Sequence, residues 1–259
     1  PPPPADRPPP PPADPPAGDD RPTGGPWPGR FLWGPPVSLV LAVAVLIAVA
    51  LSLVPVLDDR LAGAIAEFCS GLVILVAGLV LWRSLAPAPR DATLDSRASP
   101  LQTVVAGIAC GVGLIVVQGV VVVTGAAIDP GVRRAMDDPD NRVDLNLPGP
   151  ALALSLVALV VLAPLGEELL FRGLLLRAVW SRLGFAWGCA LSSLAFGLAH
   201  LDPWFTGIWP RSIALVLVGV GLALVYRRWG FATAVAAHAT VNAETGGLKL
   251  IEIHREDIH

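Results

Sequence analysis

The 259-residue sequence has little charge and almost no lysine. Only 15% of its residues are charged, and Lys249 is the single lysine among 18 basic residues. Soluble domains carry about 25% charged residues, and the mean hydropathy here is +0.64, which argues against an ordinary water-soluble enzyme. The net charge is −3 and no basic cluster exceeds two adjacent arginines, so a nucleic-acid-binding protein is also disfavoured and we expect no nucleic-acid partner.

Cysteine is equally scarce. The chain contains Cys69, Cys110 and Cys189, each within an apolar stretch. Their spacing does not match a metal site, and three thiols cannot all pair with one another. We expect them to act as small packing residues.

Apolar runs of membrane-spanning length recur along the chain. A helix needs about 20 apolar residues to cross a bilayer, and tryptophans lie at or near the ends of most runs, as interfacial aromatic residues do. The fold class we predict is all-α, a polytopic membrane helix bundle of about 7–8 transmembrane helices. The predicted spans are 37–57, 61–82, 102–125, 151–176, 185–201, 212–226 and 230–246.

The first 36 residues differ in composition from the rest. They hold 16 of the 27 prolines, a composition typical of an extended, disordered chain. We predict a disordered proline-rich tail over 1–36, a transmembrane domain over 37–247 with its functional core at about 150–245, and a polar C-terminal tail over 248–259. A partner that recognises polyproline could bind the N-terminal tail, although a solvated tail is the simpler interpretation.

The arginine distribution indicates the orientation. Alternating spans place more arginines on the side of the N-terminus than on the other side, which favours a cytoplasmic N-terminus. The nearly lysine-free composition is typical of a high-GC prokaryotic gene. We therefore expect an integral protein of a prokaryotic plasma membrane, in contact with membrane lipid.

Charged and polar side chains concentrate in three of the last four spans. A charge at the bilayer centre costs about 2.5–3.5 kcal/mol on insertion scales, so such residues are functional candidates. The strings APLGEELLFRG, FGLAH and AAHATVNAE carry them. The candidates are Glu167, Glu168, Arg172, His200, His238 and Asn242.

Helix periodicity separates the two adjacent carboxylates. Glu168 and Arg172 are four residues apart and can pair on one face, whereas Glu167 points about 100° away from Glu168. Pro164 removes one helix hydrogen bond and is expected to bend the span next to Glu167. If the helices carrying His200 and His238 start at the same face, the two histidines lie about 24 Å and about 12 Å along them, which strains a shared site.

Each feature also has a structural interpretation. The Glu168–Arg172 pair could be a structural ion pair, His200 an interfacial histidine, and His238 with Asn242 a polar contact between helices. An independent structural origin for all three, in order along the chain, is much less probable than for any one.

These strings resemble the CPBP family, the CAAX proteases and bacteriocin-processing enzymes, also called the Abi family. The family pattern is EExxxR, then FxxxH, then HxxxN, on successive membrane helices. The chain carries all three over roughly residues 150–245, with Phe196 completing the second motif.

The resemblance implies an intramembrane endopeptidase similar to type II CAAX prenyl proteases, acting on a protein or peptide substrate. Glu167 would be the general base that activates water, and His200 would orient that water. His238 and Asn242 would stabilise the oxyanion, while Glu168 with Arg172 would hold the helix and set the charge state of Glu167.

A zinc enzyme is the main variant of this interpretation. Glu167, His200 and His238 form an acceptable zinc ligand set with water in the open position, and family members are often labelled metalloproteases. The HExxH and GxGD patterns are absent. A rhomboid-like pair of His238 with Ser192 or Ser193 would leave Glu167 and His200 without a role.

Two rival classes remain open. A proton-coupled transporter would also place Glu and His within the membrane, but the first half lacks a counterpart of the Glu167 and His238 strings that an internal repeat would supply. A non-catalytic scaffold or immunity protein of the same family is the other alternative.

Overall fold

The computed structural model describes residues 27–53, 56–57, 59–137, 149–200 and 209–256, and in this part of the chain the protein is all-α. The only β pairing among these residues is a single bridge between Ser96 and Gly230. The helices are α1 (Arg30–Leu53), α2 (Asp59–Arg83), α3 (Pro87–Thr93), α4 (Pro100–Ile128), α5 (Pro130–Asp137), α6 (Gly149–Val157), η2 (Ala158–Leu162), α7 (Ala163–Glu168), η3 (Leu169–Leu176), α8 (Arg177–Leu183), α9 (Phe185–Ala199), α10 (Trp209–Trp229) and α11 (Phe231–Glu256).

Each predicted span overlaps a helix or, for 151–176, the continuous helical stretch from α6 to η3, which confirms that the described part of the chain is an all-α bundle. Four of the described helical stretches are long and apolar enough to cross a membrane, and α9 is a shorter apolar helix. The larger number, about 7–8 crossings, remains a prediction. The four stretches are Leu61–Arg83, Pro100–Ile128, Gly149–Leu183 and Trp209–Trp229.

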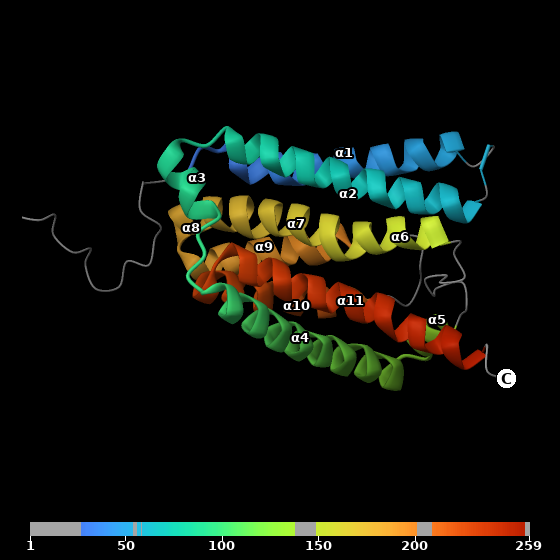
Figure 1. Cartoon of the computed structure of the whole chain (residues 1–259). Coiled ribbons are helices and arrows are strands. Elements are labelled where there is room, and N and C mark those ends of the chain that lie inside the picture. The colour runs from blue at the N-terminus through green and yellow to red at the C-terminus, as the bar shows by residue number, and fades with distance from the viewer. Residues whose placement is uncertain (1–26, 54–55, 58, 138–148, 201–208, 257–259) are drawn as a thin grey trace, which may run out of the picture.

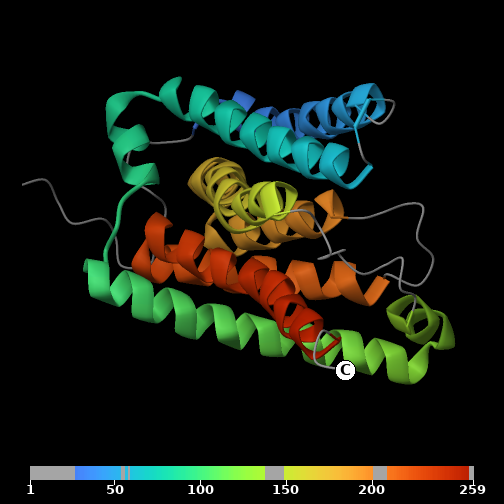
Figure 2. The same ribbon diagram turned by 45° about the vertical axis from the view of Figure 1, so that its right-hand side comes forward.

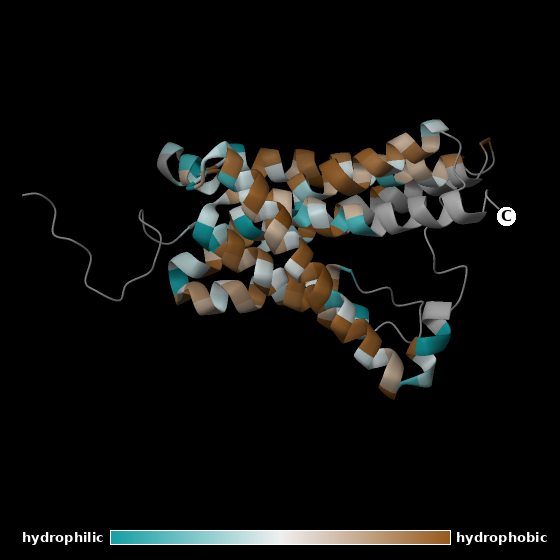
Figure 3. Ribbon diagram, turned by 60° about the horizontal axis from the view of Figure 1, so that its bottom comes forward, coloured by the Kyte–Doolittle hydropathy of each residue, from teal (hydrophilic) through white to brown (hydrophobic). Residues whose placement is uncertain are grey.

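The helix from α6 to α8 lies at the centre of the bundle. Figures 1 and 2 show α1 and α2 on one side of it and α10, α11 and α4 on the other, with α9 beside it. Most helical residues are apolar, and many hydrophilic residues lie toward the helix ends, as Figure 3 shows. Large apolar side chains on these helices are exposed, for example Val105, Val116 and Leu224. This is the distribution that a lipid-exposed surface requires.

Small residues bring α4 against α11. A Cβ at Gly107 would lie 2.5 Å from the Cβ of Ala236, and one at Gly111 would lie 2.5 Å from the Cβ of Thr240. A larger residue at either position would push the two helices apart. Membrane helices approach closely at such small residues, where van der Waals contact replaces hydrophobic burial as the driving force.

The first described residues belong to the packed bundle. Trp27 and Phe31 are buried, and the backbone N–H of Trp27 donates to the hydroxyl of Ser181 at 3.1 Å. Helix α1 begins at Arg30, so the predicted tail boundary at residue 36 falls within a helix. Most of the predicted proline-rich tail, residues 1–26, lies outside the described residues.

The predicted C-terminal boundary at residue 247 also falls within a helix. Helix α11 continues to Glu256, so the backbone of the predicted polar tail is helical over most of its length.

Cys69, Cys110 and Cys189 are all unpaired, and Cys189 is buried. Cys189 belongs to the buried apolar core and Cys110 packs against that core, as expected for packing residues.

Candidate active site

The two adjacent carboxylates lie on α7, a short stretch between two wider turns. The π-helical segments η2 and η3 flank it directly, and Pro164 lies near the start of α7. Pro164 has no N–H, and its ring crowds the carbonyl of the preceding turn. The wider π-helical turn of η2 before it reduces this steric clash. Such π segments occur frequently at functional sites, and here they set the direction of both carboxylates.

Glu168 forms the centre of a buried network. Glu168 and Arg172 are both 0% exposed, and the Glu168 Oε1 atom lies 2.9 Å from Nη1 of Arg172. The same oxygen lies 2.9 Å from Nδ1 of His238 on α11. Nη2 of Arg172 donates to the carbonyl of Gly219 on α10 at 3.2 Å. Glu168 and Arg172 together therefore connect their own helix with α11 and α10, and the predicted Glu168–Arg172 pair is present.

Glu167 points to a different place, as the 100° offset predicts. Its Oε2 lies 3.7 Å from Nε2 of His200 and 3.8 Å from Nε2 of His238. These separations exceed a hydrogen bond and are of the size that a bridging water spans. The Glu167 side chain is 12% exposed, against 0% for Glu168. The two histidines were predicted at different distances along their helices, but both rings lie beside the same oxygen, Oε2 of Glu167.

The partners of the two Nδ1 atoms define the tautomers. Nδ1 of His200 lies 2.8 Å from the carbonyl of Phe196, and Nδ1 of His238 faces the Glu168 carboxylate. Both partners accept only, so each Nδ1 carries a proton. In the neutral rings Nε2 is then the acceptor, and both Nε2 atoms face Glu167.

Phe196 holds the rings in place. Its ring contacts that of His200 at a centroid distance of 4.7 Å and that of His238 at 5.6 Å. The guanidinium of Arg172 lies over the same ring, 4.5 Å from its centroid. The phenylalanine of the FxxxH motif therefore contacts both histidines and the buried arginine.

Asn242 occupies a different position from the other motif residues. Its Nδ2 donates to the carbonyl of Leu159 in η2 at 2.9 Å. Pro164, five residues after Leu159, has no N–H to donate to this carbonyl in the i→i+5 pattern, which leaves the carbonyl available to Asn242. One Nδ2 proton of Asn242 remains for a substrate, and its role as an oxyanion donor stays a prediction.

Sequence reasoning missed two backbone acceptors, the carbonyls of Gly219 and Leu159. Neither residue has a polar side chain, so no signal in the sequence could identify them. The hydroxyl of Ser192 donates to the carbonyl of Phe171 at 3.1 Å, which occupies it in the packing of α9 on η3. A rhomboid-like pair of Ser192 with His238 is therefore not supported.

The proposed zinc ligands converge, but they do not form a metal cluster. Among the described residues, no group of three His, Cys, Asp or Glu side chains is arranged to hold a metal ion. Glu167, His200 and His238 lie within this part of the chain, and their separations of 3.7 and 3.8 Å are wider than tetrahedral ligands around zinc, about 3.3 Å apart at the usual bond lengths. We therefore assign no step of the reaction to a metal.

Comparison with known proteins adds one finding. Residues 149–243 match the family described as type II CAAX prenyl endopeptidase Rce1-like. No curated protein and no solved structure matches the chain. The matched segment contains all seven motif residues and nearly coincides with the predicted core at about 150–245. The resemblance to the CAAX protease family, drawn from three short motifs, is thus confirmed over residues 149–243.

Proposed function

We propose that this protein is an intramembrane endopeptidase that hydrolyses a peptide bond of a protein or peptide substrate with a water activated by Glu167. The observation that carries the proposal is the position of Glu167 Oε2, which lies 3.7 and 3.8 Å from the two histidine Nε2 atoms. A partly accessible carboxylate beside two oriented imidazoles is an arrangement suited to general acid–base work.

The proton transfers follow from the tautomers. Glu167 accepts a proton from the attacking water, while Nε2 of His200 accepts a hydrogen bond from the same water and orients it. The hydroxide oxygen bonds to the scissile carbonyl carbon, and the carbonyl becomes an oxyanion. The protonated Glu167 then donates its proton to the leaving amine as the C–N bond breaks. This sequence returns the carboxylate to its starting state.

His238 and Asn242 stabilise the oxyanion in this scheme. Nε2 of His238 donates to the oxyanion only when the ring carries a second proton, which this scheme takes up from solvent before the attack and returns after product release. Nδ1 keeps its contact with Glu168 in both forms. The second Nδ2 proton of Asn242 supplies a further donor. Removing one donor of this kind costs about 100- to 1,000-fold in kcat in a well-studied hydrolase, which sets the scale expected for Asn242→Ala.

Glu168 and Arg172 position the other groups. Both are fully buried, so neither reaches a substrate. Their charges keep the ring of His238 oriented toward Glu167 and fix the path of η3. Adjacent glutamates thus take two distinct roles, a general base and a structural anchor.

The rival functions make different predictions for Glu167. A scaffold of the same family would keep its function in Glu167→Gln, because this substitution preserves the shape of the side chain. A proton-coupled transporter would lose transport without any change in the protein termini of the cell. The peptidase proposal requires that Glu167→Gln abolish cleavage.

The test is a comparison of protein termini across whole cells that express the wild type, Glu167→Gln or Glu67→Gln at matched membrane levels. Glu67 lies on α2 and serves as a control glutamate outside the site. New termini in the wild type and in Glu67→Gln, but not in Glu167→Gln, would support the peptidase and name its substrates. Identical termini in all three strains would overturn it.

A further inference from the structure

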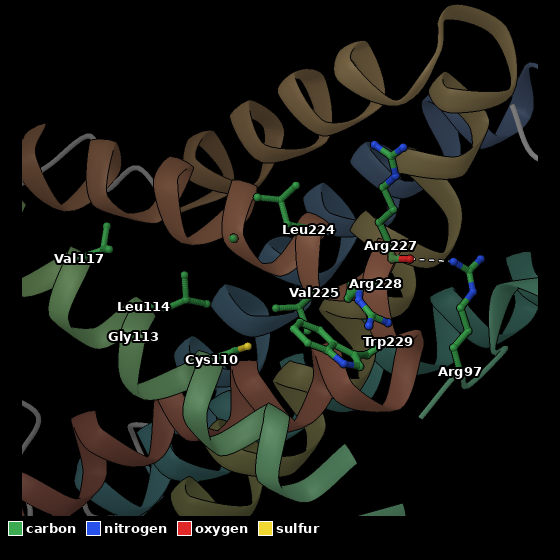
Figure 4. Close-up of a pocket in the computed structure, with 11 residues that line it drawn as sticks. Arg97, Cys110, Gly113, Leu114, Val117, Leu224, Val225, Arg227, Arg228 and Trp229 are labelled. Atoms are coloured by element: carbon green, nitrogen blue, oxygen red, sulfur yellow. Dashed lines mark hydrogen bonds between the residues drawn. The ribbon is translucent and has the colours of Figure 1, made fainter. Parts of the chain in front are cut away.

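A cavity between α4 and α10 lies apart from the carboxylates and histidines. Its volume is about 870 Å³, within the range of about 300–1,000 Å³ typical of ligand sites. Figure 4 shows the residues of the two helices around it. Its wall is apolar along most of its length and includes Gly113, Leu114, Val117, Leu224 and Val225.

The apolar wall of the cavity is exposed on the outside of the helix bundle. Val117 is 39% exposed and Leu224 is 51% exposed, and both lie on helical stretches apolar enough to cross a membrane. The cavity is therefore open to the hydrocarbon region rather than enclosed. An occupant of its apolar part must be as apolar as a lipid chain.

One end of the cavity is basic. Arg97, Arg228 and Trp229 line it there (Figure 4). Arg97 is 51% exposed and its Nε lies 3.6 Å from a carboxylate oxygen of Asp95. Arg228 is exposed, stacks over Trp229 at 5.3 Å, and forms no ion pair with any described residue. The opening of the cavity therefore carries a net positive charge.

Backbone contacts fix this end in advance. Ser96 forms a β bridge with Gly230, the N–H of Arg97 donates to the carbonyl of Trp229 at 3.1 Å, and Nη1 of Arg97 donates to the carbonyl of Arg227 at 2.7 Å. The segment before α4 is thereby attached to the turn between α10 and α11. The two arginines are held beside one opening by the fold itself.

We propose that this cavity binds an anionic phospholipid, with the phosphate between Arg97 and Arg228 and an acyl chain along the apolar wall. The charge pattern selects this occupant, because basic pockets between transmembrane helices hold anionic headgroups. The ring of Trp229 lies at the level where amphipathic aromatics meet the headgroup region. The site is separate from the proposed peptidase site and does not depend on it.

The site also contacts the catalytic framework through α10. Gly221 lines the cavity, and Gly219, two residues earlier, accepts the hydrogen bond of Arg172. A lipid that fills the cavity supports the same helix that supports the buried network. Bound lipid is therefore expected to raise the thermal stability of the protein as well as to occupy the site.

The test is a titration of the delipidated full-length protein with phosphatidylglycerol or phosphatidylcholine of identical acyl chains, followed by native mass spectrometry. Each basic residue near a membrane surface contributes about a fivefold factor in affinity. Arg97→Gln/Arg228→Gln should therefore bind phosphatidylglycerol about thirty-fold more weakly and leave phosphatidylcholine binding unchanged. The control is Arg133→Gln/Arg134→Gln, which removes two exposed arginines near α4's other end.

A second pair of variants tests the apolar wall. Val117→Phe places a ring on the apolar wall, in the path of the proposed acyl chain, and should lower phosphatidylglycerol binding. Val116→Phe, at a neighbouring position that is 60% exposed and outside the cavity, should not. Equal binding of the two lipids by the wild type would overturn the proposal. So would an equal loss in Val116→Phe and Val117→Phe, or in the two arginine double variants.

Discussion

Replacing Glu168 by Gln should destabilise the protein far more than replacing Glu167 by Gln, although the two residues are adjacent and the substitutions are identical. Glu168 lies 2.9 Å from both Arg172 and His238, and both members of its ion pair are 0% exposed. Glu167 reaches its two histidines only at 3.7 and 3.8 Å. The two variants therefore remove very different interactions.

The magnitude follows from burial. Removing one partner of a buried ion pair leaves an uncompensated charge, which costs about 3–5 kcal/mol. For a domain of this size that is a fall in Tm of about 10 °C. Glu167→Gln removes no interaction within hydrogen-bond distance, so its free energy of unfolding should change by less than about 1 kcal/mol. Its catalytic loss should instead be about 100-fold or more.

A double variant separates charge from shape. In Glu168→Gln the buried guanidinium of Arg172 has lost its counter-charge, so adding Arg172→Met removes the source of the penalty. Thermal unfolding of the detergent-purified variants should then show Glu168→Gln/Arg172→Met recovering most of the lost stability. Equal Tm values for Glu168→Gln and Glu167→Gln, or a double variant less stable than Glu168→Gln, would refute the reasoning.

Three further predictions follow. A Cβ at Gly166 would lie 2.9 Å from the backbone nitrogen of Leu75, so Gly166→Ala should displace α7 from α2 and lower both Tm and activity, measured together on one preparation. Our proposal assigns no step to a metal, so treatment of the purified protein with a strong zinc chelator should leave peptidase activity unchanged. Loss of activity with recovery on added zinc would favour the zinc variant with Glu167, His200 and His238 as ligands. Outside the spans, the hydrogen bond from Trp209 Nε1 at 2.9 Å, and then the N–H of Gly131, hold the pKa of Asp129 below its usual value of 3.8. The stability that the Asp129–Trp209 hydrogen bond contributes is therefore present above pH 3.8 and is lost as the pH falls through the lowered pKa of Asp129. The indole NMR signal of Trp209 should change over that pH range in the wild type and should not change in Asp129→Asn.

Much of the bundle could be predicted because membrane helices are constrained by their solvent. Every backbone group must be satisfied within its own helix, so apolar length located the long helices, whereas the short helices α3 and α5 lie outside every predicted span. The boundaries were less predictable. Trp27 is buried and α1 begins at Arg30, although the proline-rich composition extends to residue 36, because a few apolar side chains are enough to dock a segment against α8.

The candidate site was predictable for its side chains and not for its backbone. Scarcity made Glu167, His200 and His238 visible, since a charged or titratable group in an apolar helix carries a cost that chance seldom leaves in place. The carbonyls that hold Arg172 and Asn242 carried no such signal, because every residue has one. The apolar pattern of the sequence also could not predict the π-helical turns on both sides of α7. Pro164 indicated only where the helix would depart from regular geometry.

The difference between the adjacent glutamates depends on this combination of sequence and backbone. In a regular helix, the side chains of neighbouring residues point about 100° apart around the axis. This is enough to direct Glu168 toward buried Arg172 and Glu167 toward a partly exposed position. The two π-helical segments place that change of direction at the level of the histidines. Arg172 then compensates the charge of Glu168 inside the bundle, and its guanidinium is held by Gly219 on α10. Glu167 lies instead beside Nε2 of His200 and Nε2 of His238, and it is the carboxylate to which our proposal gives the role of general base.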